Sequence, residues 1–198
     1  MQYLWILYPL LVHSAVVTAS IWLQAAAISL LFLLALAVPM RQGRLWAWAA
    51  AISACAISVW FCQSGWGFYF LYLPPVLIHG FLALVFLHSL QPGRRALISV
   101  FAEKIRGHKL PPELERYTRQ TTWFWVFLFA SMGVMSILLA VFASHEWWSL
   151  FTNLISYLLV GAAFAVEFAL RRVLFPHLPH TGLVDYIQAL MKTDFRRP

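Results

Sequence analysis

Ionisable and polar side chains within the apolar part of the sequence are the ones that could do chemistry. Glu167 lies four residues before Arg171, a spacing that brings opposite charges together on a helix. Two interpretations are open: an ion pair near a membrane surface, or a carboxylate that faces a helical bundle and takes up a proton or cation. Asn153 lies fourteen residues before Glu167, close to four helical turns, and Tyr157 is near the same face. The spacing predicts a polar stripe.

Two histidines and a pair of prolines are further candidates. His13 and His79 lie in apolar segments, where a neutral His bonded to a backbone carbonyl and a substrate or proton site are both open interpretations. Pro74 and Pro75 precede His79 by about one turn and remove two backbone donors, which predicts a kink. Two interpretations of such a kink are open. It exposes backbone carbonyls that bind a substrate, or it only adapts the shape of the helix to a neighbouring helix. The predicted substrate-binding residues are His13, Pro74, Pro75, His79, Asn153, Tyr157 and Glu167.

Three patterns that resemble enzyme or metal motifs are weak. His180 and Asp185 have the H-x4-D spacing of glycerolipid acyltransferases, but the sequence lacks the rest of that fold. His177 and His180 lack further obvious metal ligands. The cysteines, Cys55 and Cys62, are expected to be small packing residues. We therefore predict no catalytic residue, no metal and no cofactor, and a non-enzymatic role is favoured.

Composition excludes an ordinary soluble domain. Of the 198 residues, 62% are hydrophobic and 11% are charged, whereas soluble domains carry roughly 25% charged residues. A chain of this length cannot bury so much apolar surface in water, so lipid must surround most of it. The net charge of +7 is explained by basic loops beside anionic lipid, and nucleic-acid binding is not expected.

The apolar segments predict an all-α, polytopic membrane bundle of about six transmembrane helices. Residues 2–38 carry no charge and would form a helix of about 55 Å, too long for one crossing of a hydrocarbon core of about 30 Å. A break near Thr18 to Trp22 gives two spans; the alternative is five spans, with 2–38 as one broken helix. The expected spans are 3–17, 22–38, 46–61, 68–87, 122–142 and 147–170.

Basic residues predict the orientation. All fourteen Lys and Arg lie in three regions, 41–44, 94–119 and 171–197, which six spans place on one side. The positive-inside rule makes that side cytoplasmic, with both termini there. We divide the chain into a transmembrane bundle (1–170) with a cytoplasmic amphipathic insertion (91–121), and a cytoplasmic amphipathic tail (171–198).

The insertion is expected to form interfacial helices. Apolar residues recur at helical spacing over 94–106, and Gly107 is placed to end that helix. Arg95, Ser99, Glu103 and Arg106 fall between the apolar residues. A second helix begins at Pro112 and continues into the fifth span; the tail repeats the apolar spacing over 183–191. The arginines either fix topology or contact anionic partners, and the candidates for the second role are Arg94, Arg95, Arg116 and Arg119.

Several strings resemble one family. They are Tyr72-Leu-Pro-Pro-Val-Leu-Ile78, Pro92-Gly-Arg94, Leu110-Pro-Pro-Glu-Leu-Glu-Arg-Tyr-Thr-Arg119 and Phe175-Pro-His-Leu-Pro-His180. The chain resembles, over nearly its whole length, small bacterial membrane proteins encoded in aryl-polyene and xanthomonadin-type pigment clusters. These clusters make polyene carboxylic acids and attach them to lipid. The resemblance implies a role beside that pathway in the inner membrane and supplies no catalytic residues.

Three functions follow. The first is an accessory protein of lipid-linked polyene assembly, which binds or presents an acyl or polyene lipid and docks acidic partners such as an acyl carrier protein, with membrane lipids around it. The second is a small transporter or flippase for lipid or another small molecule, which in so short a chain predicts a homodimer. A membrane acyltransferase is the least favoured.

Overall fold

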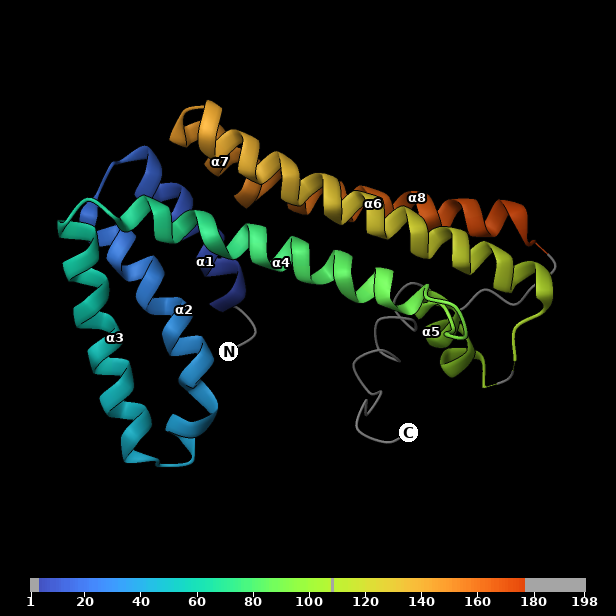
Figure 1. The fold of residues 1–198 in the computed structure, drawn as a ribbon, viewed down its shortest axis with the longest axis horizontal. Coiled ribbons are helices and arrows are strands. Elements are labelled where there is room, and N and C mark those ends of the chain that lie inside the picture. The colour runs from blue at the N-terminus through green and yellow to red at the C-terminus, as the bar shows by residue number, and fades with distance from the viewer. Residues whose placement is uncertain (1–3, 108, 177–198) are drawn as a thin grey trace. The chain divides into compact units, whose positions relative to one another are not determined.

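The fold of the described residues, 4–107 and 109–176, is entirely helical in the computed structural model of the chain, with no strand among them. Six helices are followed by a seventh that contains a π-helical turn (Figure 1). They are α1 (Leu4–Val17), α2 (Ile21–Arg41), α3 (Leu45–Gln63), α4 (Gly67–Ser89), α5 (Leu97–Arg106), α6 (Pro112–Phe142) and the last helix, composed of α7 (His145–Leu150), η1 (Phe151–Ile155) and α8 (Ser156–Leu174).

Helix lengths confirm a multi-pass α-helical membrane protein. Five helices are long and apolar enough to cross a membrane: α2, α3, α4, α6 and the continuous helix His145–Leu174. The helix in place of the first predicted span, α1, is apolar but has 14 residues. Its length of about 21 Å is less than the hydrocarbon thickness of about 30 Å. Five of the six predicted spans are therefore present at full length.

The predicted break in the long uncharged segment lies at Thr18–Ser20. Ala19 takes a left-handed conformation with φ 49°, and the Ser20 side chain caps α2 by accepting a hydrogen bond of 3.4 Å from the Leu23 N–H. These two features end one helix and begin another. Residues 4–41 are thus two packed helices, α1 and α2, as the two-helix interpretation predicts.

The described residues divide into two compact units. The first unit contains the chain up to His79 together with Met132–Leu158, and the second contains Gly80–Ser131 and the residues from Leu159 onward. In the first unit α2 lies alongside α3, and α1 packs on α2 (Figure 1). Its core joins side chains from α1, α2, α3, α4 and α7: Val12, Val16, Ala25, Ala27, Ile28, Cys62, Leu71 and Trp148.

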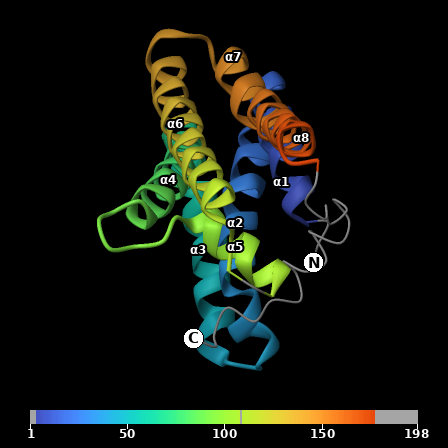
Figure 2. The same cartoon turned by 90° about the vertical axis from the view of Figure 1, so that its right-hand side faces the viewer.

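Aromatic side chains form the core of the second unit. Trp125 on α6 is 2% exposed, and its ring lies 5.5 Å from Phe129 and 4.5 Å from Phe164 on α8. Phe86 on α4 also contacts Phe129, with ring centroids 5.6 Å apart. Figure 2 shows α5 beside the first turns of α6. The second unit therefore joins α4, α5, α6 and α8 through one aromatic cluster and one short helix.

Helix ends in the insertion match the prediction, and one turn does not. Gly107 ends α5 in the left-handed conformation with φ 71°, and α6 begins at Pro112. The predicted spans leave 143–146 as a connection, but it is shorter in the structure, because His145 and Glu146 already belong to α7 and only Ala143 and Ser144 connect the helices. The amphipathic tail helix predicted over 183–191, with His177, His180 and Asp185, lies outside the described residues.

Candidate functional site

A small cavity in the second unit gathers charge from three helices. Its volume is about 50 Å³, and it is mostly enclosed. Its charged residues are Arg106 from α5 and Glu167 and Arg171 from α8, while Thr118 and Trp125 from α6 supply part of the wall. The remaining lining is apolar, namely Ile98, Ala102, Leu114 and Phe164. The cavity therefore places two guanidinium groups and one carboxylate beside an apolar wall.

Two of the charged side chains in this cavity form an ion pair. Arg171 Nε lies 3.6 Å from Glu167 Oε1, and the two side chains are 20% and 18% exposed, so the predicted ion pair is present and partly buried. Burial lowers the pKa of Arg106, and the nearby Arg171 guanidinium lowers it further. Arginine stays protonated at neutral pH in spite of such shifts. The cavity therefore holds two protonated guanidinium groups and the Glu167 carboxylate side by side.

An apolar groove lies between α6 and α8 and shares Glu167 with the cavity. Its volume is about 250 Å³, and Phe124, Ala163, Val166 and Leu170 form its apolar lining. Its polar residues are Tyr117, Gln120, Thr121 and Glu167. The Tyr117 hydroxyl donates a long hydrogen bond of 3.5 Å to the Glu167 carbonyl oxygen. The groove and the cavity are therefore neighbouring spaces on either side of one residue.

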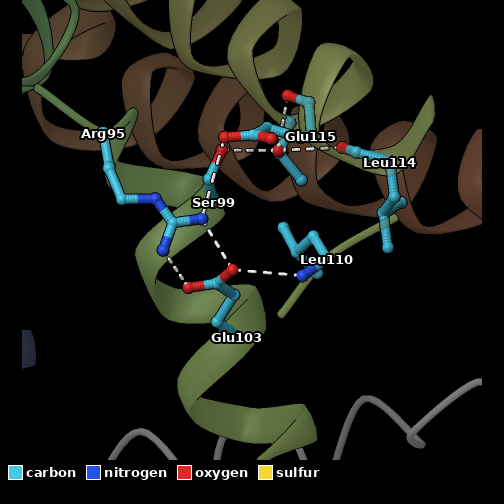
Figure 3. Close-up of polar contacts among 7 residues, drawn as sticks. Arg95, Ser99, Glu103, Leu110, Leu114 and Glu115 are labelled. Atoms are coloured by element: carbon cyan, nitrogen blue, oxygen red, sulfur yellow. Dashed lines mark hydrogen bonds and ion pairs between the residues drawn. The ribbon is translucent and has the colours of Figure 1, made fainter. Parts of the chain in front are cut away.

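Helix α5 is held on α6 by a buried hydroxyl pair. Ser99 is fully buried, and its Oγ lies 2.6 Å from Thr118 Oγ1. Thr118 Oγ1 is also within hydrogen-bond distance of the Leu114 carbonyl, at 2.9 Å, and of the Glu115 carbonyl, at 3.0 Å (Figure 3). Both hydroxyls are thus satisfied without water. This pair fixes the face of α5 that meets α6.

An ion pair beside the hydroxyls completes the contact, which we call the α5–α6 clasp (Arg95, Ser99, Glu103, Leu110 and Thr118). Arg95 donates to both carboxylate oxygens of Glu103, with Nη2 to Oε1 at 2.6 Å. The Leu110 N–H donates to Glu103 Oε1 at 3.1 Å (Figure 3). The Arg95 hydrogen bonds, and after them the Leu110 hydrogen bond, lower the pKa of Glu103.

The clasp is expected to weaken in acid. Because folding lowers the pKa of Glu103, its contribution is complete above the unfolded value of about 4.3 and is lost as pH falls from there through the lower folded value. Hydrogen exchange of the 97–106 backbone, corrected for intrinsic rates, should show less protection at pH 3 than at pH 6. Glu103→Gln should already be less protected at pH 6 and change little with pH. An equal acid response in that variant would assign the effect to other carboxylates.

Most of the arginines predicted as anion contacts have partners within the second unit. Arg94 donates to Nε2 of His88, and Arg119 Nη2 donates to the Leu90 carbonyl at 3.0 Å. Arg95 is held by Glu103 and lies 3.7 Å from Glu115. Arg116 is exposed and has no hydrogen bond or ion pair with any residue in the described ranges. Of the four, Arg116 is therefore best placed for an external anion.

A second polar cluster lies in the first unit at the π-helical turn. His13 Nδ1 on α1 lies 3.1 Å from Ser149 Oγ, and Asn153 Nδ2 donates to the Ser149 carbonyl at 3.0 Å and to Ser149 Oγ at 3.2 Å. The π-helical turn spans Phe151–Ile155 and so contains Asn153. Tyr157 is 59% exposed. The structure thus brings His13 and Asn153 together through Ser149.

The candidate residues in α4 are Pro74, Pro75 and His79. The helix α4 is continuous from Gly67 to Ser89 through Pro74 and Pro75, so it is not interrupted there (Figure 1). The prolines still deprive the Phe70 and Leu71 carbonyls of their usual donors. His79 is 9% exposed, and its Nδ1 has no hydrogen-bond partner among the described residues.

The predicted polar stripe divides between the units. Asn153 belongs to the first unit and Glu167 to the second, and each has its own partners there. Sequence reasoning did not find Ser149, or the role of Arg106 beside Arg171. Arg106 is the last residue of α5, and its half-buried side chain lines the cavity.

Cofactor and family information add no further constraint. Within residues 4–107 and 109–176, no group of three or more His, Cys, Asp or Glu side chains is arranged to hold a metal ion. The cysteines of that range are both free, with Cys62 buried and Cys55 half-buried. No protein-family model, curated protein or solved structure matches the chain.

Proposed function

We propose that this protein is an accessory component of lipid-linked aryl-polyene assembly in the inner membrane of a bacterium. It holds an acyl or polyene chain in the membrane and docks acidic cytoplasmic partners, with both of its termini in the cytoplasm. The observation that carries the proposal is the apolar groove between α6 and α8, which shares the lining residue Glu167 with the charged cavity. The resemblance of the sequence to proteins of pigment clusters supplies the pathway.

The groove suits an extended apolar chain. Its walls come from two helices that each have the length of a membrane span, and Tyr117, Gln120 and Thr121 precede the predicted start of the fifth span at 122, so we place the groove at the cytoplasmic membrane surface. Its polar side chains, with Glu167 shared by the cavity, are few beside its apolar surface. A narrow apolar space with a few polar groups is the common form of a small-molecule site. A polyene chain, which is rigid and flat, loses little conformational entropy on entering it.

Partner docking belongs to the exposed basic residues of the second unit. Arg116 is exposed near the start of α6, and Arg94 and Arg119 are already committed to His88 and Leu90. An acidic protein such as an acyl carrier protein, or an anionic lipid headgroup, is the matching partner for an exposed guanidinium. This part of the proposal places Arg116 at the contact and leaves Arg95 in the clasp.

Filling the groove tests chain binding. Cis-parinaric acid, a fluorescent conjugated polyene acid, is added to purified protein in phosphatidylcholine nanodiscs and, separately, to empty nanodiscs. Binding to the protein should change the fluorescence of the acid relative to the empty nanodiscs. Val166→Trp should weaken this binding at least tenfold, because Val166 lines the groove and is 57% exposed, so a larger side chain occupies the ligand space without disturbing the core. The readout is a titration of the dissociation constant.

The matched control is Val173→Trp on the same helix. Val173 is 75% exposed and does not line the groove, so this variant should bind the probe like the wild type. Absence of probe binding by the wild-type protein would overturn the proposed function. Equal binding of the probe by Val166→Trp and Val173→Trp would mean that the groove is not the binding site.

A second candidate function is a small, homodimeric transporter or flippase. The specific observation in its favour is the His13–Ser149–Asn153 cluster at a π-helical turn, because π-turns are frequent at functional sites and polar groups within membranes are rare without a role. Proteoliposomes loaded with a pH-sensitive dye separate the two functions. A substrate-driven proton flux would support the transporter, and probe binding without flux supports the accessory role.

A further inference from the structure

A second apolar groove follows α2 in the first unit. Its volume is about 460 Å³, and Trp48 of α3 forms part of its wall. The α2 residues that line it recur every three to four positions and so form one stripe along the helix: Leu30, Leu33, Leu34, Ala37, Met40 and Arg41. The groove is therefore apolar along its length and carries a guanidinium group at the last residue of α2.

The length of this α2 groove matches one leaflet of a membrane. Leu30 and Arg41 are eleven residues apart, which is about 17 Å along a helix. Half of a hydrocarbon core of about 30 Å is about 15 Å. Trp46 and Trp48, which are 54% and 51% exposed, follow the loop after Arg41, and tryptophan is enriched at membrane surfaces. We therefore expect the Arg41 end at headgroup depth and the Leu30 end near the membrane centre.

Arg41 is available to an external anion. Its side chain is exposed and has no hydrogen bond or ion pair with any described residue. Among the described residues of the first unit the one carboxylate is Glu146, beside His145, whose ring stacks on Phe68 just after the C-terminal end of α3. Arg41 precedes the N-terminal end of α3, and this helix of 19 residues is about 28 Å long. The carboxylate of this unit therefore lies at the far end of α3 from the guanidinium group.

A membrane lipid with an anionic headgroup suits both features of the groove. Its acyl chain fits an apolar stripe of leaflet depth, and its phosphate, at headgroup depth, pairs with a guanidinium group. A zwitterionic lipid carries a cation close to its phosphate, so it gains less from Arg41.

We propose that the α2 groove binds one anionic phospholipid, with the phosphate at Arg41 and one acyl chain along the stripe from Leu30 to Ala37. The groove shares no described lining residue with the groove between α6 and α8. This lipid site is therefore independent of the proposed function, and either can fail without the other.

Native mass spectrometry of the full chain in detergent micelles measures the affinity for a single lipid. Dioleoylphosphatidylglycerol is anionic and dioleoylphosphatidylcholine is zwitterionic, and the two have the same acyl chains. Each lipid is titrated into the delipidated protein, and the dissociation constant of the first bound lipid is determined. The wild type should bind phosphatidylglycerol about fivefold more tightly, which is the effect of one basic residue on an anionic lipid. Equal affinities for the two lipids would overturn the site.

Arg41→Gln tests the headgroup contact. It should weaken phosphatidylglycerol binding about fivefold and leave phosphatidylcholine binding unchanged. Arg44→Gln is the matched control, because Arg44 is exposed in the same loop and does not line the groove, so screening by salt keeps its effect below about twofold. Equal losses in the two variants would show a diffuse attraction to the loop and would contradict a site at Arg41. So would an undiminished preference for phosphatidylglycerol in Arg41→Gln.

Ala37→Phe tests the chain contact. Ala37 lines the groove, so phenylalanine takes the space of the acyl chain and should weaken binding of both lipids about fivefold through lost packing contacts. Ala35→Phe should bind both lipids like the wild type, because Ala35 is exposed on the same helix and does not line the groove. Unchanged lipid binding by Ala37→Phe would place the lipid elsewhere. A lipid-free dimer that dissociates in Ala37→Phe would assign the groove to a second copy of the chain instead.

Folding is controlled by circular dichroism melts of all variants. Arg41 is exposed, so its variants test the headgroup contact even if Ala37→Phe does not fold. Arg41→Lys keeps the charge and loses the planar fork, so its affinity for phosphatidylglycerol should fall between those of the wild type and Arg41→Gln. If folded Arg41→Lys binds this lipid no better than Arg41→Gln does, positive charge is not what the groove uses to select its lipid, and the proposal fails.

Discussion

Trp125→Ala should lower the free energy of unfolding of the second unit by about 3 kcal/mol, the low end of the range for a buried aromatic residue. Trp125 is 2% exposed and its ring contacts Phe86, Phe129 and Phe164, so its removal opens a hole among side chains from three helices. Lipid is as apolar as the core, which reduces the transfer contribution, but the lost dispersion contacts remain.

The measurement is unfolding in detergent micelles with a graded denaturing detergent, followed by circular dichroism. Trp123→Ala is the matched control, because Trp123 lies on the same helix, is 40% exposed and stacks on Phe127 alone among the described rings. Its effect should stay within about 1 kcal/mol, which is typical of partly exposed sites. Similar losses for the two tryptophans would show that the aromatic cluster is not the core of the unit.

Trp148→Ala should destabilise the first unit by about 1–3 kcal/mol, the net of two opposing effects. Trp148 is fully buried, and its ring packs edge-on against Tyr72 with centroids 4.6 Å apart, so alanine leaves a cavity. Its Nε1–H, however, has no hydrogen-bond partner among the described residues. Removal of this unsatisfied buried donor recovers part of the free energy lost with the packing contacts. The net destabilisation should therefore be smaller than that of Trp125→Ala.

Trp148→Phe tests this explanation directly. Phenylalanine keeps an aromatic ring against Tyr72 and removes the unpaired donor, so the variant should be as stable as the wild type or slightly more stable. Trp147→Ala provides the surface control, because Trp147 is 64% exposed. Hydrogen exchange in α1 and α7 reports the first unit specifically. A large loss of stability in Trp148→Phe would mean that Nε1 has a partner in solution.

Helix ends were predictable because they depend on local chemistry. Gly107 ends α5 in a left-handed conformation that other residues rarely adopt, and Pro112 begins α6 where no backbone donor is needed. The break after Val17 follows from a run too long for one membrane crossing. Each of these depends on a few consecutive residues or on total length. These helix ends were therefore accessible from the sequence, whereas the short length of α1 and the start of the last helix at His145 were not.

Partners of polar side chains were not predictable in the same way. The helical spacing of α5 assigned Ser99 and Glu103 to the face between its apolar residues, which suggests water as their neighbour. In the structure Ser99 is fully buried and the Glu103 side chain is 17% exposed, because Thr118 and the Leu110 N–H supply their hydrogen bonds. Periodicity separates polar from apolar faces but does not say which polar face another helix will satisfy.

The π-helical turn shows the same limit for the last helix. Its extra residue per turn changes which residues share a face, and the sequence around Asn153 carries no mark of it. The prediction that Asn153 and Glu167 share one face assumed a regular α-helix throughout. The hydrogen bonds of Asn153 join this turn to Ser149 in α7. Through these hydrogen bonds and its contact with His13, Ser149 belongs to the polar cluster, although the sequence did not indicate it.

The short reach of the α5–α6 clasp has a consequence for the order in which the protein is made. Glu103 and Leu110 are seven residues apart and Ser99 and Thr118 nineteen, so at about 5–20 residues per second a ribosome completes each pair within a few seconds. Arg171 is synthesised 65 residues after Arg106, roughly 3–13 s later at the same rate. During that interval the nascent chain can carry a docked α5 with Arg106 in place, and only the final helix adds the second guanidinium.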